Sequence, residues 1–350
     1  MFIYGRYSLK YLKTFLGFII ALASLYVVFE KTNFVAISQI ISSIRLSHLI
    51  CALFFVSFSV LLKSLRWQLL LKFFTTFDLK DVFVSFSMGN MMNMLLPFRS
   101  GDLVKVFALS QKRNISKASI LGTVVYEHIL DFLALSLVFC VALLTYDFPI
   151  SRWIKFPIFF LTLGCSFFLM CIFSFKEQIQ KIKSWATNLP NDNQKLYMRL
   201  FRYFIKHVLA NISLYYSCRD SLKIFTYTLL IWFINGCWLY FLFLSFNESF
   251  HYQFGIGEVS VLLLAMSLAV MVPSAPSYIG TLHLATVIVL RPTGIPRDLI
   301  ISYAILIHAT GTFVAIAMGF LSWISLLKPQ GAIFFKNFMS LFNLKLRPDT

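Results

Sequence analysis

Long apolar runs separated by short polar segments dominate this chain. A transmembrane helix needs about 20 apolar residues, and by that measure the sequence predicts about six full spans. Their approximate ranges are 14–30, 48–71, 119–145, 154–175, 223–246 and 299–327. The pattern predicts an all-α polytopic membrane protein.

Two further apolar regions, 82–110 and 257–291, are each interrupted near the middle by proline and glycine. Proline lacks a backbone donor and clashes with the preceding helical turn, so an unbroken helix through it is costly. Broken backbone within a bilayer is tolerated only where protein or a water-filled cavity satisfies its polar groups. We therefore expect two broken re-entrant hairpins, although two ordinary crossings in 257–291 would give the same end-points.

The distribution of basic residues predicts the orientation. Segment 176–223 has nine Lys and Arg against three acidic residues, so it should be cytoplasmic, whereas loop 247–258 has two Glu and no Lys or Arg. Both termini then fall inside, and the two halves have inverted topology. Matching interruptions in inverted halves are typical of a transporter with a site near the bilayer midplane. Arg291 and Arg297 on the outer side count against this orientation.

The resulting organisation is a single membrane domain over 1–350. Its expected parts are a first half 1–175 with hairpin 82–110, a cytoplasmic connector 176–222, a second half 223–330 with hairpin 257–291, and a cytoplasmic tail 331–350. Apolar residues recur at helical spacing in the connector, with basic residues on another face. This pattern favours either a basic amphipathic helix on the inner leaflet or a helix packed on the membrane domain.

The composition agrees with a membrane protein, since 59% of residues are hydrophobic and 13% charged. The net charge of +17 comes mainly from basic residues that flank apolar runs. This placement favours anionic lipid over nucleic acid as the partner. The cysteines form no CxxC pair, so we expect no metal or redox cofactor. The absence of a GxxxxGK[ST] loop argues against an ATPase.

Charged residues also occur inside or beside the apolar runs. Arg66 lies near the cytoplasmic end of the second span, where snorkelling as a membrane anchor would suffice. Glu127, His128 and Asp131 lie deep in span 119–145, and Glu127 and Asp131 share one helical face. Carboxylates at that depth must be paired, hydrated or protonated. They are either a structural ion pair with Arg66 or Arg99, or they handle substrate or protons.

The first interruption carries Arg99 and Asp102, with Asn93 upstream. Ser100 is a candidate N-cap for a helix that begins at Gly101, and free backbone N–H groups beside an arginine suit a phosphate or carboxylate. The alternative is a turn stabilised by an Arg99–Asp102 pair.

In the second interruption a helix again restarts after a proline, with Ser277 as a possible cap and Thr281 just beyond it. His283, together with His308 on the last span, gives weak support for a polar cavity in this half.

Four segments together resemble the lysylphosphatidylglycerol synthase transmembrane (flippase-like) family, and they extend over most of the chain. They are LRW at 65–67, LLPFRSGD at 95–102, GTVVYEHILD at 122–131 and PSAPSYIGT at 273–281. Four positions depart from the family pattern. Asp102 replaces a Glu, His128 replaces an Arg, Ser277 replaces a Gly, and His283 lies near a position where an acidic residue is common.

The resemblance implies two inverted halves with re-entrant helices. In two-domain relatives such a unit translocates an aminoacylated phospholipid made by a soluble synthase domain. Only twenty residues follow Gln330 here, so lysyl transfer by this chain alone is not expected.

We expect an inner-membrane protein that moves a phospholipid or isoprenoid-linked lipid with an anionic headgroup, supplied by a separate synthase or glycosyltransferase. Two alternatives stay open. One is a membrane-embedded transferase that uses Glu127 or Asp131 as a base, and the other is a non-transporting partner subunit. Oligomerisation is left open, and no nucleic-acid partner is expected.

Overall fold

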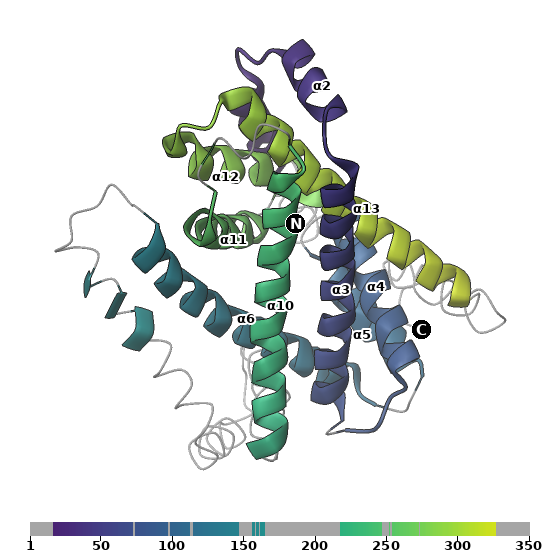
Figure 1. Cartoon of the computed structure of the whole chain (residues 1–350). Helices are drawn as coiled ribbons and strands as arrows, with labels where there is room; N and C mark the ends of the chain where they lie inside the picture. The colour runs from purple at the N-terminus through teal and green to yellow at the C-terminus, as the bar shows by residue number, and fades with distance from the viewer. Residues whose placement is uncertain are drawn as a thin grey trace, which may run out of the picture.

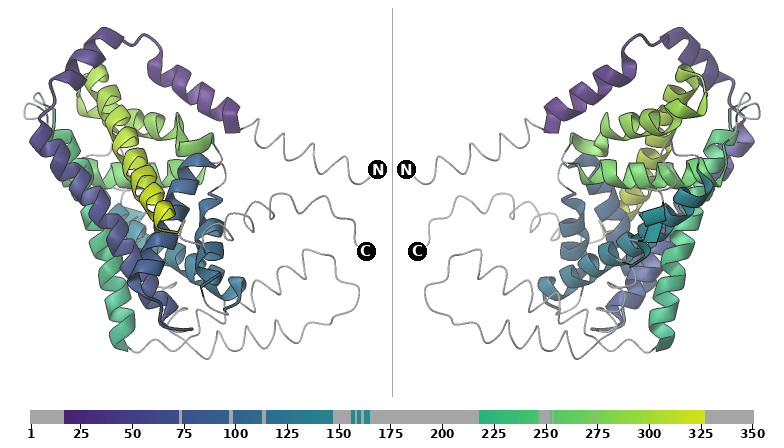
Figure 2. Two further views of the ribbon diagram at one scale, coloured as in Figure 1. Left: turned by 90° about the vertical axis from the view of Figure 1, so that its right-hand side faces the viewer. Right: turned by 90° about the vertical axis from the view of Figure 1, so that its left-hand side faces the viewer.

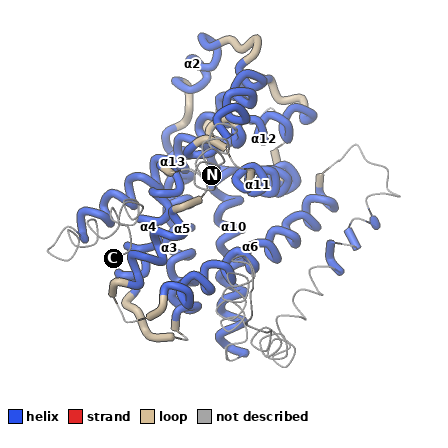
Figure 3. The backbone as a smooth tube through the Cα atoms, turned by 180° about the vertical axis from the view of Figure 1, so that it is seen from behind, coloured by secondary structure: helices blue, strands red, loops and turns tan. Residues whose placement is uncertain are grey.

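Four long helices form the frame of the molecule, which is described here from a computed structural model. The structure describes residues 17–72, 74–96, 99–112, 115–146, 156–157, 159–160, 162–164, 218–246, 252, 254–272 and 274–326. Every regular element in these ranges is helical (Figure 3). The four long helices are α3 (Leu46–Leu71), α6 (Lys117–Thr145), α10 (Cys218–Leu244) and α13 (Arg297–Leu326) (Figure 1). Each is long and apolar enough to cross a membrane, which confirms the predictions for 48–71, 119–145, 223–246 and 299–327.

The first predicted span, 14–30, matches a helix within the described residues, and a sharp bend follows it. A helix at Gly17–Phe29 is followed by α2 (Phe34–Ser42), and the two are bent by 84°. Asn33 caps α2 by accepting hydrogen bonds from the backbone N–H groups of Val35 and Ala36 at 3.1 and 3.2 Å. This bent pair is the fifth candidate span. Most of predicted span 154–175, the amphipathic helix of the connector and the tail 331–350 lie outside the described residues.

Each interrupted region contains two shorter helices that pack on each other. The first region holds α4 (Leu79–Leu95) and α5 (Gly101–Ser110), and the second holds α11 (Ile256–Met271), the 3₁₀ turn η2 (Pro276–Tyr278) and α12 (Thr281–Leu290). Another 3₁₀ turn, η3 (Arg291–Thr293), follows α12. The four α-helices have 17, 10, 16 and 10 residues, fewer than the roughly 20 that a full crossing takes. Pro97 and Pro273 lie outside the described residues.

The two ends of the first hairpin lie together. Asp81 in the first turn of α4 and Lys112 just after α5 form an ion pair at 3.2 Å. The start of the hairpin also lies beside the end of α3, because the Gln68 side chain donates to the Phe77 carbonyl at 2.8 Å. Lys72 after α3 lies 4.0 Å from Asp220 at the start of α10. The first hairpin therefore opens on the side of the molecule where α3 ends and α10 begins.

The second hairpin opens beside the end of α6. A Cβ on Gly257 in α11 would lie 2.9 Å from the Thr145 carbonyl oxygen. The Tyr146 hydroxyl donates to the Val289 carbonyl of α12 at 3.2 Å. The first and last turns of this hairpin thus meet at the same point, the C-terminal end of α6.

Each hairpin packs on a long helix from the other half of the chain. Helix α4 lies along α13, α11 lies along α6, and α3 lies along α10 (Figures 1 and 2). Gly319 makes the first contact possible, because a Cβ there would overlap the Met91 side chain of α4. The largest hydrophobic core runs through both halves and includes Trp67, Phe243 and Tyr303. The halves are therefore interlocked.

Candidate functional site

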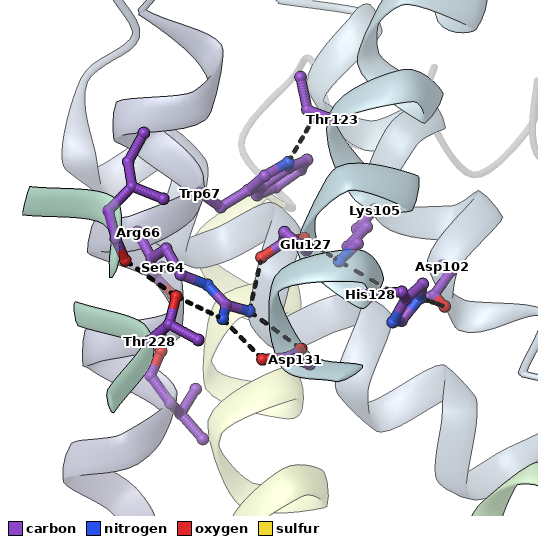
Figure 4. A network of polar contacts seen from close by, with 12 residues as sticks. Ser64, Arg66, Trp67, Asp102, Lys105, Thr123, Glu127, His128, Asp131 and Thr228 are labelled. Atoms are coloured by element: carbon purple, nitrogen blue, oxygen red, sulfur yellow. Dashed lines mark hydrogen bonds and ion pairs between the residues drawn. The ribbon is translucent and has the colours of Figure 1, made fainter. Parts of the chain in front are cut away.

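Arg66 is a paired interior cation. Its side chain is 2% exposed, and its two terminal nitrogens bind the two Asp131 oxygens at 2.6 and 3.1 Å (Figure 4). Nη1 also donates to the Thr228 hydroxyl of α10 at 3.3 Å. A two-point guanidinium–carboxylate contact fixes orientation as well as charge. The anchor interpretation of Arg66 is therefore wrong, and the pairing of Asp131 with Arg66 is the alternative that the structure supports.

Glu127 lies between two cations. Its Oε2 is 2.8 Å from Lys105 Nζ, and its Oε1 is 3.6 Å from Arg66 Nη2. Lys105 comes from α5 and lies over the rings of Trp67 and Phe86, 5.1 and 4.8 Å from their centroids. The Lys105 and Glu127 side chains are 6% and 3% exposed, and burying either charge alone would be costly. Helices α3, α5 and α6 are thus held together by one buried charge network.

Asp102 extends the network to the first interruption. His128 Nε2 lies 3.1 Å from Asp102 Oδ2, and Lys105 Nζ lies 3.7 Å from Asp102 Oδ1. His128, with 44% of its side chain exposed, therefore contacts Asp102 from the neighbouring helix and does not pair with Glu127 next to it in sequence. We call Arg66, Asp102, Lys105, Glu127, His128 and Asp131 the charge network (Figure 4).

Arg99 lies at the break itself and is exposed. Its φ of 51° lies in the left-handed region, which costs energy for a side chain other than glycine. Its positive charge interacts with the Asp102 carboxylate and with the Tyr278 hydroxyl. Within the part of the chain that the structure describes, no carboxylate lies within ion-pair distance of Arg99. The alternative of an Arg99–Asp102 pair is therefore wrong.

The residues around Arg99 serve the packing of the hairpin. Helix α5 begins at Gly101 as expected, but the Ser100 side chain makes no capping hydrogen bond. Gly101 faces α4, since a Cβ there would overlap the Gly89 carbonyl oxygen and lie 2.6 Å from Asn93 Oδ1. That Asn93 oxygen is buried and has no hydrogen-bond partner among the described residues. The close approach of α4 and α5 is what brings Lys105 and Asp102 to α6.

The second interruption contacts the first. Ser277 and Tyr278 both have left-handed backbone, with φ of 61° and 58°. The Ser277 hydroxyl lies 3.0 Å from the Thr312 hydroxyl and donates to Met94 Sδ at 3.5 Å. Met94 lies at the end of α4, so the two breaks meet in space although they are far apart in sequence.

Three predicted residues of the second half make contacts within that half or with its neighbours. Ser277 does not cap α12, which starts after Gly280. Thr281 is buried and bonds locally, to the Tyr278 carbonyl at 3.1 Å and the Ser274 hydroxyl at 3.4 Å. His283 lies outside the charge network, and its ring centroid is 5.1 Å from that of His308.

The charges at the first interruption balance. The network contributes three carboxylates and two cations, and Arg99 beside it adds a third cation. Three cations against three carboxylates leave no net charge when His128 is neutral. The arrangement can hold one anionic group at the exposed Arg99. In the described ranges no cluster of His, Cys, Asp or Glu could hold a metal ion.

Lys105 is the main residue that sequence reasoning missed. It follows Asp102 by three residues and is the one charged side chain in the segment LVKVFAL, a signal that points to a paired partner in a membrane protein. Met94 and Thr312 carry no comparable signal, because their contact depends on how the two halves pack.

Comparison with known proteins gives two matches. The lysylphosphatidylglycerol synthase TM region family matches residues 14–319. A UPF0104 membrane protein of Methanocaldococcus jannaschii is 30% identical over 200 residues, which cover 57% of this chain and 78% of that relative. The family match over residues 14–319 includes both interruptions and every residue of the charge network. It confirms the resemblance seen in the motifs. The chain therefore belongs to the lysylphosphatidylglycerol synthase TM region family.

Proposed function

We propose that this integral membrane protein moves lipids with an anionic headgroup between the leaflets of the cytoplasmic membrane. The observation that carries the proposal is Arg99, an exposed arginine without a carboxylate partner among the described residues. It lies where the two interruptions meet, beside the charge network and the Tyr278 hydroxyl. The cargo is a phospholipid or an isoprenoid-linked lipid, delivered by a separate synthase or glycosyltransferase.

The proposed layout places the two hairpins as re-entrant elements that enter from opposite faces, with both termini inside. Three observations support it. The helices of both hairpins are short, the ends of each hairpin lie together, and the hairpins open at opposite ends of α10. Helix α4 of the first hairpin packs on α13 of the second half, and α11 of the second hairpin packs on α6 of the first half. Two inverted repeats would produce this reciprocal packing. Rocking of one half against the other would then expose Arg99 to each leaflet in turn.

In this mechanism the charge network positions the binding residue. Lys105 and Asp102 fix the start of α5, and Arg99 beside it binds the headgroup through charge-assisted hydrogen bonds. Asp131 and Glu127 are each held by a cation at 2.6 and 2.8 Å. A general base must be available to take a proton from its substrate, so this pairing favours transport over the transferase alternative.

A transport assay tests the proposal. The protein would be reconstituted into phosphatidylcholine vesicles containing a trace of acyl-labelled fluorescent phosphatidylglycerol, and flipping would be followed by dithionite quenching. We expect Arg99→Ala to slow flipping about tenfold or more, because a hydrogen bond to a charged group contributes about 1.5–3 kcal/mol. Arg99→Lys should retain part of the rate. Arg291→Ala removes another exposed arginine, in η3, and is the matched control.

Equal rates for wild type and Arg99→Ala would contradict the site, and equal flipping of labelled phosphatidylcholine would contradict the preference for anionic headgroups. Mass spectrometry of the same vesicle lipids separates the transferase alternative. Transport changes the leaflet of the lipid, whereas transfer changes its mass.

A further inference from the structure

A buried and a half-buried histidine lie together on the second hairpin and the last long helix, outside the charge network. His283 of α12 is 6% exposed, and its ring centroid lies 5.1 Å from that of His308 on α13. Phe29, at the end of the N-terminal helix, covers His283 with ring centroids 6.4 Å apart. The site therefore lies between three elements of the fold.

The hydrogen bonds of the pair leave it able to accept a proton. His308 Nε2 lies 3.0 Å from the Ser277 carbonyl oxygen, and since a carbonyl only accepts, this nitrogen carries the hydrogen. Nδ1 of a neutral His308 is then a free base. His283 Nδ1 is buried and has no hydrogen-bond partner among the described residues. An orphaned nitrogen of this kind in an otherwise satisfied core calls for a function.

No carboxylate balances the pair within the described structure. The titratable or charged groups on the surrounding elements are Tyr26 on the N-terminal helix, Glu30 and Lys31 after it, Arg99 and Asp102 at the first interruption, Glu258 at the start of α11, Tyr278 in η2, Arg291 after α12, and Arg297, Asp298 and Tyr303 on α13. Among the described residues, the only charge that reaches His283 is that of His308. An imidazolium here would be an unpaired buried charge, which is costly. The pair therefore stays neutral unless an anion comes close.

The pair is connected to Arg99 by two consecutive residues. The Ser277 carbonyl binds His308, and the charge of Arg99 reaches the hydroxyl of the next residue, Tyr278. Both residues have left-handed backbone, so the turn is strained and its shape depends on these contacts. An anion bound at Arg99 would contact the same turn whose Ser277 carbonyl binds His308.

We propose that His283 and His308 form a proton-binding site that is filled together with the anionic headgroup at Arg99. This inference rests on the proposed function. A proton from water adds to the lone pair of an imidazole nitrogen, and no other bond is made or broken. The anion supplies the missing counter-charge, and by linkage the proton strengthens the binding of the anion by the same factor. Proton uptake would then be coupled to loading.

Direct observation of the imidazoles tests the site without any transport. The ¹⁵N-histidine-labelled protein in phosphatidylcholine nanodiscs would be studied by NMR at about pH 8 and about pH 6, on either side of the ordinary imidazole pKa of about 6.5. The protein has six histidines, so the readout is an additional imidazolium signal that appears at the lower pH only when phosphatidylglycerol is added. It should be missing from His283→Gln and His308→Gln and present in the control His48→Gln. Glutamine can still donate to the Ser277 carbonyl, and a gel-filtration profile checks folding.

Binding of fluorescent phosphatidylglycerol to the same nanodiscs gives the second readout. We expect wild-type affinity to rise about five- to tenfold between the two pH values, and both glutamine variants to bind with one affinity throughout. A variant that keeps the wild-type pH dependence, or the lack of any lipid-dependent imidazolium signal in the wild type, would overturn the proton site. If Arg99→Ala binds as well as wild type, the headgroup site of the proposed function is wrong. If only the pH dependence is missing, the proposed function stands and this inference falls.

Discussion

At the scale of single residues, the contact of Lys105 with Glu127 is a short ion pair, 2.8 Å, between two buried side chains of the charge network. Removing one partner leaves the other charge buried, which typically costs about 3–5 kcal/mol. We expect Lys105→Met and Glu127→Gln each to lower the free energy of unfolding by that order. The double variant should lose at least about 1 kcal/mol less than the sum of the two. Denaturation in detergent micelles measures all three.

The matched control is the ion pair of Lys112 and Asp81, whose side chains are 29% and 32% exposed. Exposed pairs contribute about 0.2–1 kcal/mol, so Lys112→Met with Asp81→Asn should show little coupling. Similar coupling in the two cycles would mean that burial of the network does not stabilise the fold.

The sequence predicted that the carboxylates of α6 need partners and named Arg66 among the candidates, but it did not identify the partner that comes from α5. The spacing of Glu127 and Asp131 placed both on one face of α6, and the cost of membrane charge required partners for them. Lys105 precedes Glu127 by 22 positions, and this contact exists only because α5 folds back beside α6. The sequence also showed where single residues depart from the family pattern, such as His128 in place of an Arg. It did not show what those residues contact. His128 contacts Asp102 from across the hairpin, which no local pattern encodes.

At the scale of elements, the first hairpin depends on the absence of a side chain at Gly101. A Cβ at this position would overlap the Gly89 carbonyl oxygen and lie 2.6 Å from the Asn93 nitrogen, both backbone atoms of α4. We expect Gly101→Ala to lower the free energy of unfolding by about 1–3 kcal/mol or more, as overpacking does. Thermal unfolding measures the loss. Gly164→Ala is the control, since a Cβ there meets nothing within 4 Å, and an equal loss in both variants would contradict close packing as the cause.

Hydropathy predicted the long helices well because a bilayer leaves few alternatives to an apolar run of that length. It also placed an apolar helix at 14–30, but it did not show the bend of 84° that follows, where Asn33 caps α2. The prediction that Ser277 is a helix cap was wrong. The chain after Pro276 makes a 3₁₀ turn with left-handed residues before α12 begins, a geometry fixed by contacts with α4 and α13.

At the scale of the whole molecule, the contact between the two interruptions could not be predicted from the sequence, because it depends on how the halves pack against each other. Met94 Sδ lies 3.5 Å from the Ser277 hydroxyl and 4.0 Å from that of Thr312. If transport requires the halves to rock apart, this contact must open in each cycle. A covalent link here should therefore stop transport while leaving the fold intact.

We expect Met94→Cys with Thr312→Cys, in a background without the native cysteines, to be linked by a bifunctional methanethiosulfonate reagent and then to lose flipping of labelled phosphatidylglycerol. Reduction should restore the rate, and each single variant should flip lipid in both conditions. The control pair is Asp81→Cys with Lys112→Cys, which links the two ends of one hairpin, 3.2 Å apart between their charged atoms. That link lies within a single moving unit, so it should leave the rate unchanged. Full-rate flipping by the cross-linked Met94 and Thr312 variant would show that the halves do not separate there, and alternating access would have to arise elsewhere in the molecule.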